Sequence, residues 1–338
     1  MNYSKSISIL ILMFIICISV YSCSNNNPVT SVAADSTIDS ARYNWREFIA
    51  PNDLNVNGVW IRDTNEIYLL NNPGLIKFSN GSFASITLDN FYPVRIACLD
   101  KNTAYLFGGR TGSAPLNLSV KKWNGFNFSD ITTDTNSIGD VRICYFYKPN
   151  EIWLTGYNDL LYKFDGSTFT NFPITLPSGN NNIQQIFFDS TTHTLRALIW
   201  TSVGSDFKYS LYDFNGSSWN MTIEINLPNG TFPQSLAGYI VSKNKTEVNI
   251  FRNNVFSEFL QSRGFQFDYY IDGSLINNIM VGGIDKNTND NYYYNWNGLK
   301  WSREFKHSNL YSLLIPFSDK FYLIINEKAN ILNIGTKK

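Results

Sequence analysis

The side chains whose type and spacing best suit chemistry are polar residues that recur near the start of successive predicted strands. Two are arginines in the same V-R-I context, Arg95 and Arg142. Two guanidinium groups presented together can hold a carboxylate or a phosphate. The remaining side chains carry amides, which suit hydroxyl-rich ligands. The shared V-R-I context predicts that the two arginine side chains point the same way. We predict that the polar residues form one ligand-binding ring near a mouth of the central channel that the innermost strands would line: Asn57, Arg95, Arg142, Gln184, Gln234, Gln266 and Asn309.

A simpler interpretation of this ring remains open. Polar residues also begin strands merely because strand ends lie near solvent. Each arginine could pair with a nearby carboxylate, such as Asp100 or Asp140, and serve only stability.

No residue pattern indicates a catalytic or metal centre. The two histidines, His193 and His307, lack the spacing of metal ligands, and neither a G-x-S-x-G elbow nor a P-loop occurs. The run Asp285–Asp290 has oxygen ligands at alternate positions, as calcium loops do, but it lacks the glycine at its sixth position, and Trp296 replaces the terminal glutamate. Glycosidase chemistry needs two facing carboxylates, and no such pair stands out. We therefore predict no metal, no cofactor and no catalytic residue.

Composition narrows the class of partner. Lysine plus arginine equals aspartate plus glutamate at 27 each, so no overall field attracts a nucleic acid. Aromatic residues make up 16% of the chain, which favours strands. The successive tyrosines Tyr292–Tyr294 must point to opposite faces of a strand, so part of that area could stack on a sugar or a partner. An ordinary outer strand is the alternative.

A repeated hairpin motif predicts the strands that would position these residues. Six times an aromatic residue is followed by Asn or Asp, then Gly (Asn in one copy), then a second aromatic residue, a sequence typical of a tight turn between two strands. The turns are centred at 81, 125, 166, 216, 254 and 298, which leaves gaps of 44, 41, 50, 38 and 44 residues. A hairpin that recurs at this period predicts a β-propeller with four strands in each blade.

The blade count depends on the two ends of the chain. After the sixth hairpin, three further strands follow without a fourth, and Arg42–Phe48 parallels Leu299–Phe305, the outer strand of the sixth blade. We predict an all-β, seven-bladed propeller in which Arg42–Phe48 completes the last blade, with Trp45 buried there. Such closure removes open sheet edges. Six blades plus an extra hairpin is the alternative.

With these motifs the chain resembles the bacterial seven-bladed propeller lipoproteins, whose kelch- and BNR-like repeats carry a W/F-N/D-G-x-x-W/F hairpin. The double glycines in L-F-G-G (Leu106–Gly109) and V-G-G (Val281–Gly283) are similar to those of kelch repeats. The resemblance covers about residues 42–338, and its motifs are structural.

The N-terminus resembles a bacterial lipoprotein signal. Lys5 precedes the apolar run Ile7–Val20, which is too short to span a bilayer comfortably, and V-Y-S-C follows with Cys23 as the predicted lipidated residue. We expect a signal peptide over 1–23, a flexible tether over 24–41 and the propeller over 42–338. By resemblance to known sorting rules, Ser24 directs the protein to the outer membrane. Ordinary secretion, or a periplasmic location, is the alternative.

Cys98 and Cys144 lie on predicted strands one residue out of step, so we favour two buried free thiols over a disulfide. The sequence as a whole favours a membrane-anchored extracytoplasmic binding or scaffold module with a protein or glycan partner in the cell envelope, no nucleic acid, and membrane contact through the lipid anchor only. A glycan-active enzyme and a structural component of an envelope or secretion complex are the alternatives.

Overall fold

A computed structural model of the chain describes residues 38–338, apart from short stretches. The chain divides into two units, Met1–Ala34 and Asp35–Lys338, and every described residue belongs to the second. Cys23 and the rest of the expected signal peptide therefore lie outside the described residues. The stretches left out within the second unit are 35–37, 52, 72–73, 111–117, 132–140, 157–159, 190–191, 204–205, 226, 228–231, 237–238, 253–254, 276, 308–311, 319 and 328.

The second unit is built from seven antiparallel sheets of four strands each, which are the blades of a propeller. The first four blades are β2 (Val56–Asp63), β3 (Glu66–Asn71), β4 (Gly74–Ser79) and β5 (Ser82–Ile86); β6 (Phe91–Cys98), β7 (Ala104–Arg110), β8 (Leu118–Trp123) and β9 (Phe128–Ile131); β10 (Ile143–Lys148), β11 (Glu151–Thr155), β12 (Leu161–Phe164) and β13 (Phe169–Phe172); and β14 (Asn180–Asp189), β15 (Thr194–Val203), β16 (Asp206–Phe214) and β17 (Trp219–Ile225). The other three are β18 (Phe232–Leu236), β19 (Tyr239–Lys243), β20 (Glu247–Arg252) and β21 (Val255–Gln261); β22 (Phe265–Leu275), β23 (Asn278–Asp285), β24 (Asn291–Trp296) and β25 (Trp301–Lys306); and β26 (Ser312–Ser318), β27 (Phe321–Asn326), β28 (Ile331–Lys337) and β1 (Tyr43–Ile49).

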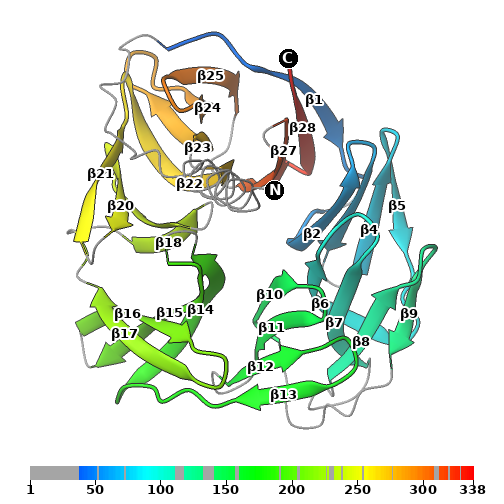
Figure 1. Cartoon of the computed structure of the whole chain (residues 1–338). Helices are drawn as coiled ribbons and strands as arrows, with labels where there is room; N and C mark the ends of the chain where they lie inside the picture. Colours follow the sequence, from blue (N-terminus) through cyan, green and yellow to red (C-terminus); the bar gives the residue numbers. More distant parts are fainter. Residues whose placement is uncertain are drawn as a thin grey trace, which may run out of the picture. The chain divides into compact units, whose positions relative to one another are not determined.

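The blades follow one another around a ring in chain order (Figure 1). The first strand of each of blades 1–6 is its innermost, and innermost strands of neighbouring blades touch, as β6 touches both β2 and β10. The seams between blades are apolar. The seam between blades 7 and 1, for example, packs Leu323 and Ile325 of β27 against Ile67 and Leu69 of β3.

The repeated hairpin motif joins the outer two strands of a blade, and its two aromatic residues are cross-strand partners. Trp123 lies opposite Phe128, with ring centroids 5.2 Å apart, and both pack on the seam with the preceding blade. The Asn124 Oδ1 atom accepts hydrogen bonds from the backbone N–H groups of Phe126 and Asn127. Gly125, which lies between Asn124 and Phe126, has a φ of 107°. The motif therefore encodes both the turn and a contact in the seam between two blades.

Blade 7 joins the two ends of the propeller. Its outer strand is β1, which pairs antiparallel with β28 from Tyr43 opposite Lys337 to Ile49 opposite Ile331. The predicted all-β, seven-bladed fold is confirmed, as is the closure by the N-terminal strand. The six-bladed alternative is wrong, because β1 adds to the three C-terminal strands and completes their sheet.

A buried carboxylate holds the start of β1 against blade 6. Glu304 of β25 is 7% exposed, and its carboxylate accepts hydrogen bonds from the backbone N–H groups of Arg42 and Tyr43, at 3.0 and 3.1 Å. The Ser302 hydroxyl donates to the same carboxylate at 2.7 Å. Just before β1, Asp39 forms a parallel bridge with Ser302. The closing strand is thus attached to blade 6 through polar contacts and to blade 7 through the sheet.

The predicted burial of Trp45 is only partly correct. Trp45 is half-buried, because its ring lies over Gly335 on the partner strand and 4.6 Å from the ring of Phe305, with one side open. The fully buried aromatic residue of β1 is Tyr43, which is 2% exposed and packs edge-on against Tyr322. Strand alternation places both side chains on one face, and Tyr43 lies deeper.

We expect Tyr43→Ala to lower the free energy of unfolding by about 3–5 kcal/mol, as loss of a large buried aromatic side chain does. Trp45→Ala should cost less because that side chain is half-exposed. Urea unfolding measures both. Ile49→Ala on the same strand is the matched control, since Ile49 is 73% exposed and should change stability by about 0.5 kcal/mol or less. Equal effects of Tyr43→Ala and Ile49→Ala would contradict the role of Tyr43 in closure.

Candidate functional site

The propeller has two faces that differ in which connections they carry. The turns inside the first and last strand pairs of a blade lie together, as shown by the hydrogen bond from Asn80 N to Asn65 O in blade 1. We call this the hairpin face. The turns between the middle strands lie beside the connections between blades, as shown by the bond from Ser262 N to Thr246 O. We call this the connection face, and the innermost strands begin there.

The described residues of the predicted ring lie in the innermost strands or, for Arg142, directly before one, and several of these strands are irregular there. In blades 1, 2 and 4 one extra residue interrupts the pairing, namely Asn57, Val94 and Gln184. In blade 3, Ile143 lies opposite Thr155, and the Arg142 N–H also donates to the Thr155 carbonyl. Such bulges re-aim side chains and increase the local twist of a strand.

The two arginines occupy different positions of the bulge, which corrects the expectation that their shared V-R-I context aims them alike. Arg142 precedes the residue that pairs with strand β11, as Asn57 and Gln184 do in their blades. Arg95 is instead the paired residue, opposite Phe107. A shift of one residue turns a strand side chain to the other face, so the arginines approach the mouth from different directions.

Arg95 spans the seam between blades 2 and 3. Its Nε donates to the Arg142 carbonyl at 2.6 Å, and its Nη1 donates to the Val94 carbonyl at 2.8 Å. The alternative that Arg95 pairs with Asp100 is wrong, because Asp100 lies toward the hairpin face, where it caps the turn by accepting from Asn102 N and Thr103 N. Among the described residues, no carboxylate forms an ion pair with Arg95. Asp140 is not described.

The amide-bearing members of the ring divide into two kinds. Gln234 crosses to the next blade, where its Nε2 donates to the Ile271 carbonyl at 3.3 Å, much as Arg95 crosses its own seam. Asn57, Gln184 and Gln266 are exposed, as is Arg142. Asn309 lies outside the described residues. The structure therefore gives the connection-face mouth several exposed polar groups together with the Arg95 guanidinium, which among the described residues is hydrogen-bonded to backbone oxygens.

Two thiols lie on the innermost strands of blades 2 and 3, Cys98 at the end of β6 and Cys144 near the start of β10. Cys98 and Cys144 are free, and the Cys98 thiol is 3.9 Å from the Val59 carbonyl. Burial raises the pKa of Cys98 to about 11, and burial together with the nearby Cys98 raises the pKa of Cys144, against the opposing charge of Arg95. Both residues keep some exposed area, while the sulfur atoms themselves are desolvated.

We expect neither thiol to react with Ellman's reagent at neutral pH in the folded protein, because the thiolate is the nucleophile. The rate at Cys98 should keep rising as the pH approaches 11, whereas an unfolded thiol is largely ionised by about pH 9. The measurement uses a chain with Cys17 and Cys23 replaced by serine, with and without guanidinium. Rapid native labelling at neutral pH would contradict the burial of the sulfur atoms.

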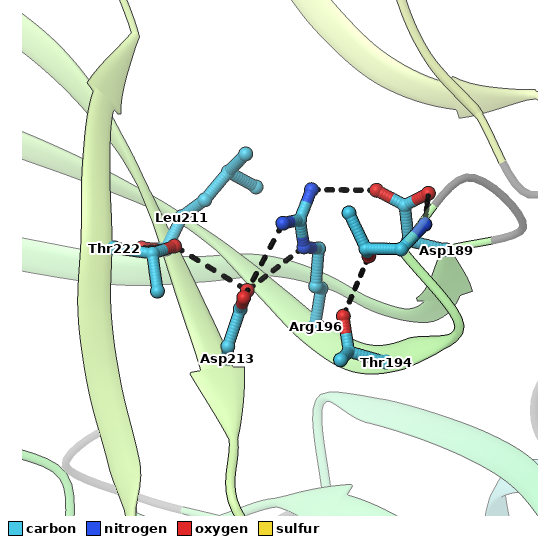
Figure 2. Close-up of polar contacts among 7 residues, drawn as sticks. Asp189, Thr194, Arg196, Leu211, Asp213 and Thr222 are labelled. Atoms are coloured by element: carbon cyan, nitrogen blue, oxygen red, sulfur yellow. Dashed lines mark hydrogen bonds and ion pairs between the residues drawn. The ribbon is translucent and has the colours of Figure 1, made fainter. Parts of the chain in front are cut away.

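A second polar cluster lies in blade 4, near the hairpin face (Figure 2). Arg196 of β15 donates through Nη1 to Asp189 at 2.6 Å and through Nε to Asp213 at 2.8 Å, while Thr222 donates to Asp213 at 3.3 Å. The Asp189 side chain is 3% exposed. One guanidinium thus holds both carboxylates, and this arrangement is a structural cluster rather than an open acid–base pair.

The sequence shows one sign of this cluster. The position of Arg196 in its blade is occupied in blades 1–3 by the aromatic residues Tyr68, Tyr105 and Trp153, as the strand pairings show. A charged residue there needs buried partners, and the neighbouring strands supply two aspartates.

The remaining chemical candidates have structural roles. The Asp285 Oδ1 atom accepts from the N–H groups of Asn287 and Thr288, and its Oδ2 pairs with Arg303. Tyr293 and Tyr294 are buried. His193 sits in the β14–β15 turn at a φ of 54°. Among the described residues, no group of three His, Cys, Asp or Glu side chains is placed to hold a metal ion.

Comparison with known proteins defines the class of the fold and no more. No protein-family model and no curated protein matches the sequence. Solved propellers do match in structure. YCF48 bound to D1 peptide is 15% identical in sequence, with a TM-score of 0.62; the match covers 89% of this chain and 100% of the YCF48 chain. YCF48 from Cyanidioschyzon merolae has 11% identity, covers 86% and 98%, and has a TM-score of 0.60. The chain is a seven-bladed β-propeller of the same architecture.

Proposed function

We propose that the protein is a binding module that holds an acidic segment of a protein partner at the connection-face mouth, around Arg95 and Arg142. The observation that carries the proposal is the pairing of Arg95. Its two hydrogen bonds go to backbone carbonyls, whereas Arg196, Arg62 and Arg303 each contact a carboxylate. A guanidinium fixed by neutral oxygens keeps its charge available to a ligand carboxylate.

A peptide fits this mouth better than a small metabolite. The exposed groups around the arginines come from several blades and carry amides, which suit backbone carbonyls and N–H groups spread along a chain. A propeller of the same fold is known bound to a peptide, YCF48 with D1 peptide. That similarity supports a protein partner for this chain, while the residues that would bind it are argued from this structure alone.

We expect Arg95→Gln with Arg142→Gln to weaken binding of acidic peptides about tenfold or more, because charged hydrogen bonds at a binding site are costly to lose. An array of acidic and matched amide-substituted peptides, followed by calorimetry, measures this. Arg142→Gln alone removes one charge while keeping the carbonyl that Arg95 uses. Arg46→Gln, an exposed arginine on β1, is the matched control. Unchanged binding in the double variant would place the site elsewhere.

We also propose that Cys23 is lipidated and anchors the propeller to the outer membrane. The support is the sequence alone: an apolar run, V-Y-S-C and a polar stretch after it. The part of the chain that the structure describes has no helix long and apolar enough to cross a bilayer.

We expect Cys23→Ser to move the protein from the detergent phase to the aqueous phase in Triton X-114 partitioning, because two or three acyl chains supply most of the membrane affinity. The control is Cys98→Ser, which leaves the predicted anchor intact. Equal partitioning of the Cys23→Ser variant and the parent would contradict the lipid anchor.

A further inference from the structure

Blade 4 is longer than blade 5, and among the described residues no strand of blade 5 covers the end of one of its sheet faces. Strands β14 and β15 have 10 residues each, while β18 and β19 of blade 5 have 5 each. The two blades pack through Leu198 and Leu211 against Ile240 and Phe251. Beyond Leu198 the strands of blade 4 continue toward the connection face, and the described part of blade 5 has no strand of matching length there.

The uncovered face carries a set of side chains that we call the blade 4 shelf. Cross-strand partners share a face of a sheet. Trp200 lies opposite Tyr209 and Asn182, and Ser202 lies opposite Phe207 and Asn180. Tyr209 also lies opposite Ile225, which is 4% exposed, and both pack in the seam with blade 5. Outside that buried edge, the shelf consists of Trp200, Ser202, Phe207, Asn180 and Asn182, with Tyr209 at its border.

The aromatic part of the shelf is ordered and open. The rings of Trp200 and Phe207 are nearly parallel, with an interplanar angle of 15° and centroids 5.5 Å apart. Phe207 is 63% exposed, and Trp200 and Tyr209 are half-buried. A large aromatic side chain on water-exposed sheet, held by a stacked partner, marks a surface on which something binds. A single exposed apolar residue such as Phe126, which is 93% exposed, has no such arrangement around it.

The polar part of the shelf is neutral. The Asn180 and Asn182 amides and the Ser202 hydroxyl frame the rings, and each can donate and accept hydrogen bonds. The nearest ion pair, Lys208 with Glu224, lies on the opposite face of the sheet, because Lys208 is opposite Thr201. A charged ligand would find no counter-charge among the shelf side chains.

We propose that the blade 4 shelf is a binding site for neutral carbohydrate chains. A sugar ring has an apolar face of C–H groups, which suits the electron-rich face of an aromatic ring. Its edge carries hydroxyls, each of which both donates and accepts hydrogen bonds, as amides do. Flat, open aromatic faces beside neutral amides match this chemistry, and an extended chain of sugars can lie along a surface that has no deep pocket. The shelf is on blade 4 and is independent of the arginines at the mouth.

The test uses the full chain and six-residue oligosaccharides of neutral sugars as probes: β-1,4-, β-1,3- and α-1,4-linked glucose, and β-1,4-linked N-acetylglucosamine. Saturation-transfer NMR and calorimetry report binding. We expect at least one probe to bind, and Phe207→Ala to weaken it about tenfold or more, a usual loss for a central aromatic contact. Trp200→Ala should do the same. Because Phe207 is exposed, its replacement should leave the melting temperature unchanged.

Phe126→Ala is the matched control for an exposed phenylalanine, and Arg142→Gln separates this site from the mouth; neither should change oligosaccharide binding. The proposal is overturned if none of the probes binds, or if Phe207→Ala binds them as the parent does. It is also overturned if oligogalacturonate, an anionic probe, binds more tightly than every neutral one. Finally, a dimer in sedimentation that Phe207→Ala dissociates would show that the shelf holds a second copy of the chain.

Discussion

The antiparallel pairing of β1 with β28 is the constraint on which the rest of the propeller depends. Each blade is covered by its two neighbours, so one missing outer strand would expose both an edge of blade 7 and part of its seam. The Glu304 carboxylate adds a second attachment by accepting from the backbone N–H groups of Arg42 and Tyr43. The chain's two ends are therefore held by interactions that link residues more than 250 positions apart.

Closure also holds the innermost strands in place. The innermost strands are anchored on both sides by neighbouring blades, so their bulges at the connection face are held in place although bulges interrupt the hydrogen-bond ladder. Close contact between the backbones of β6 and β7 helps to hold the bulge of β6, since a Cβ at Gly108 would lie only 2.0 Å from the Tyr92 carbonyl. The first glycine of the pair in blade 2 is thus explained by the packing of β6 on β7, without reference to any repeat family.

The two proposed sites use different chemistry because the surrounding structure differs. At the mouth, Arg95 is held by carbonyl oxygens of two neighbouring blades, and no described carboxylate pairs with it. On the blade 4 shelf, neutral amides surround stacked rings that blade 5 does not cover. At the opposite end of the same blade, the Arg196 guanidinium is mostly buried and already paired with two aspartates, so its charge is compensated within the blade.

Much of the architecture follows from the sequence because it is local. Asn124 and Gly125 specify a turn between residues that are neighbours in the chain, and the aromatic residues on either side pair across it. The period at which this motif recurs therefore predicts the blades. Even the closure was predictable, since Arg42–Phe48 resembles an outer strand that lacks its own hairpin. What the tertiary structure decided is the aim of individual side chains. Arg95 and Arg142 share a local sequence, yet a bulge shifts one against the other by a residue, and bulges depend on the partner strand. Likewise, Phe207 is exposed beside a blade whose first two strands are short, and no stretch of sequence around Phe207 contains that fact.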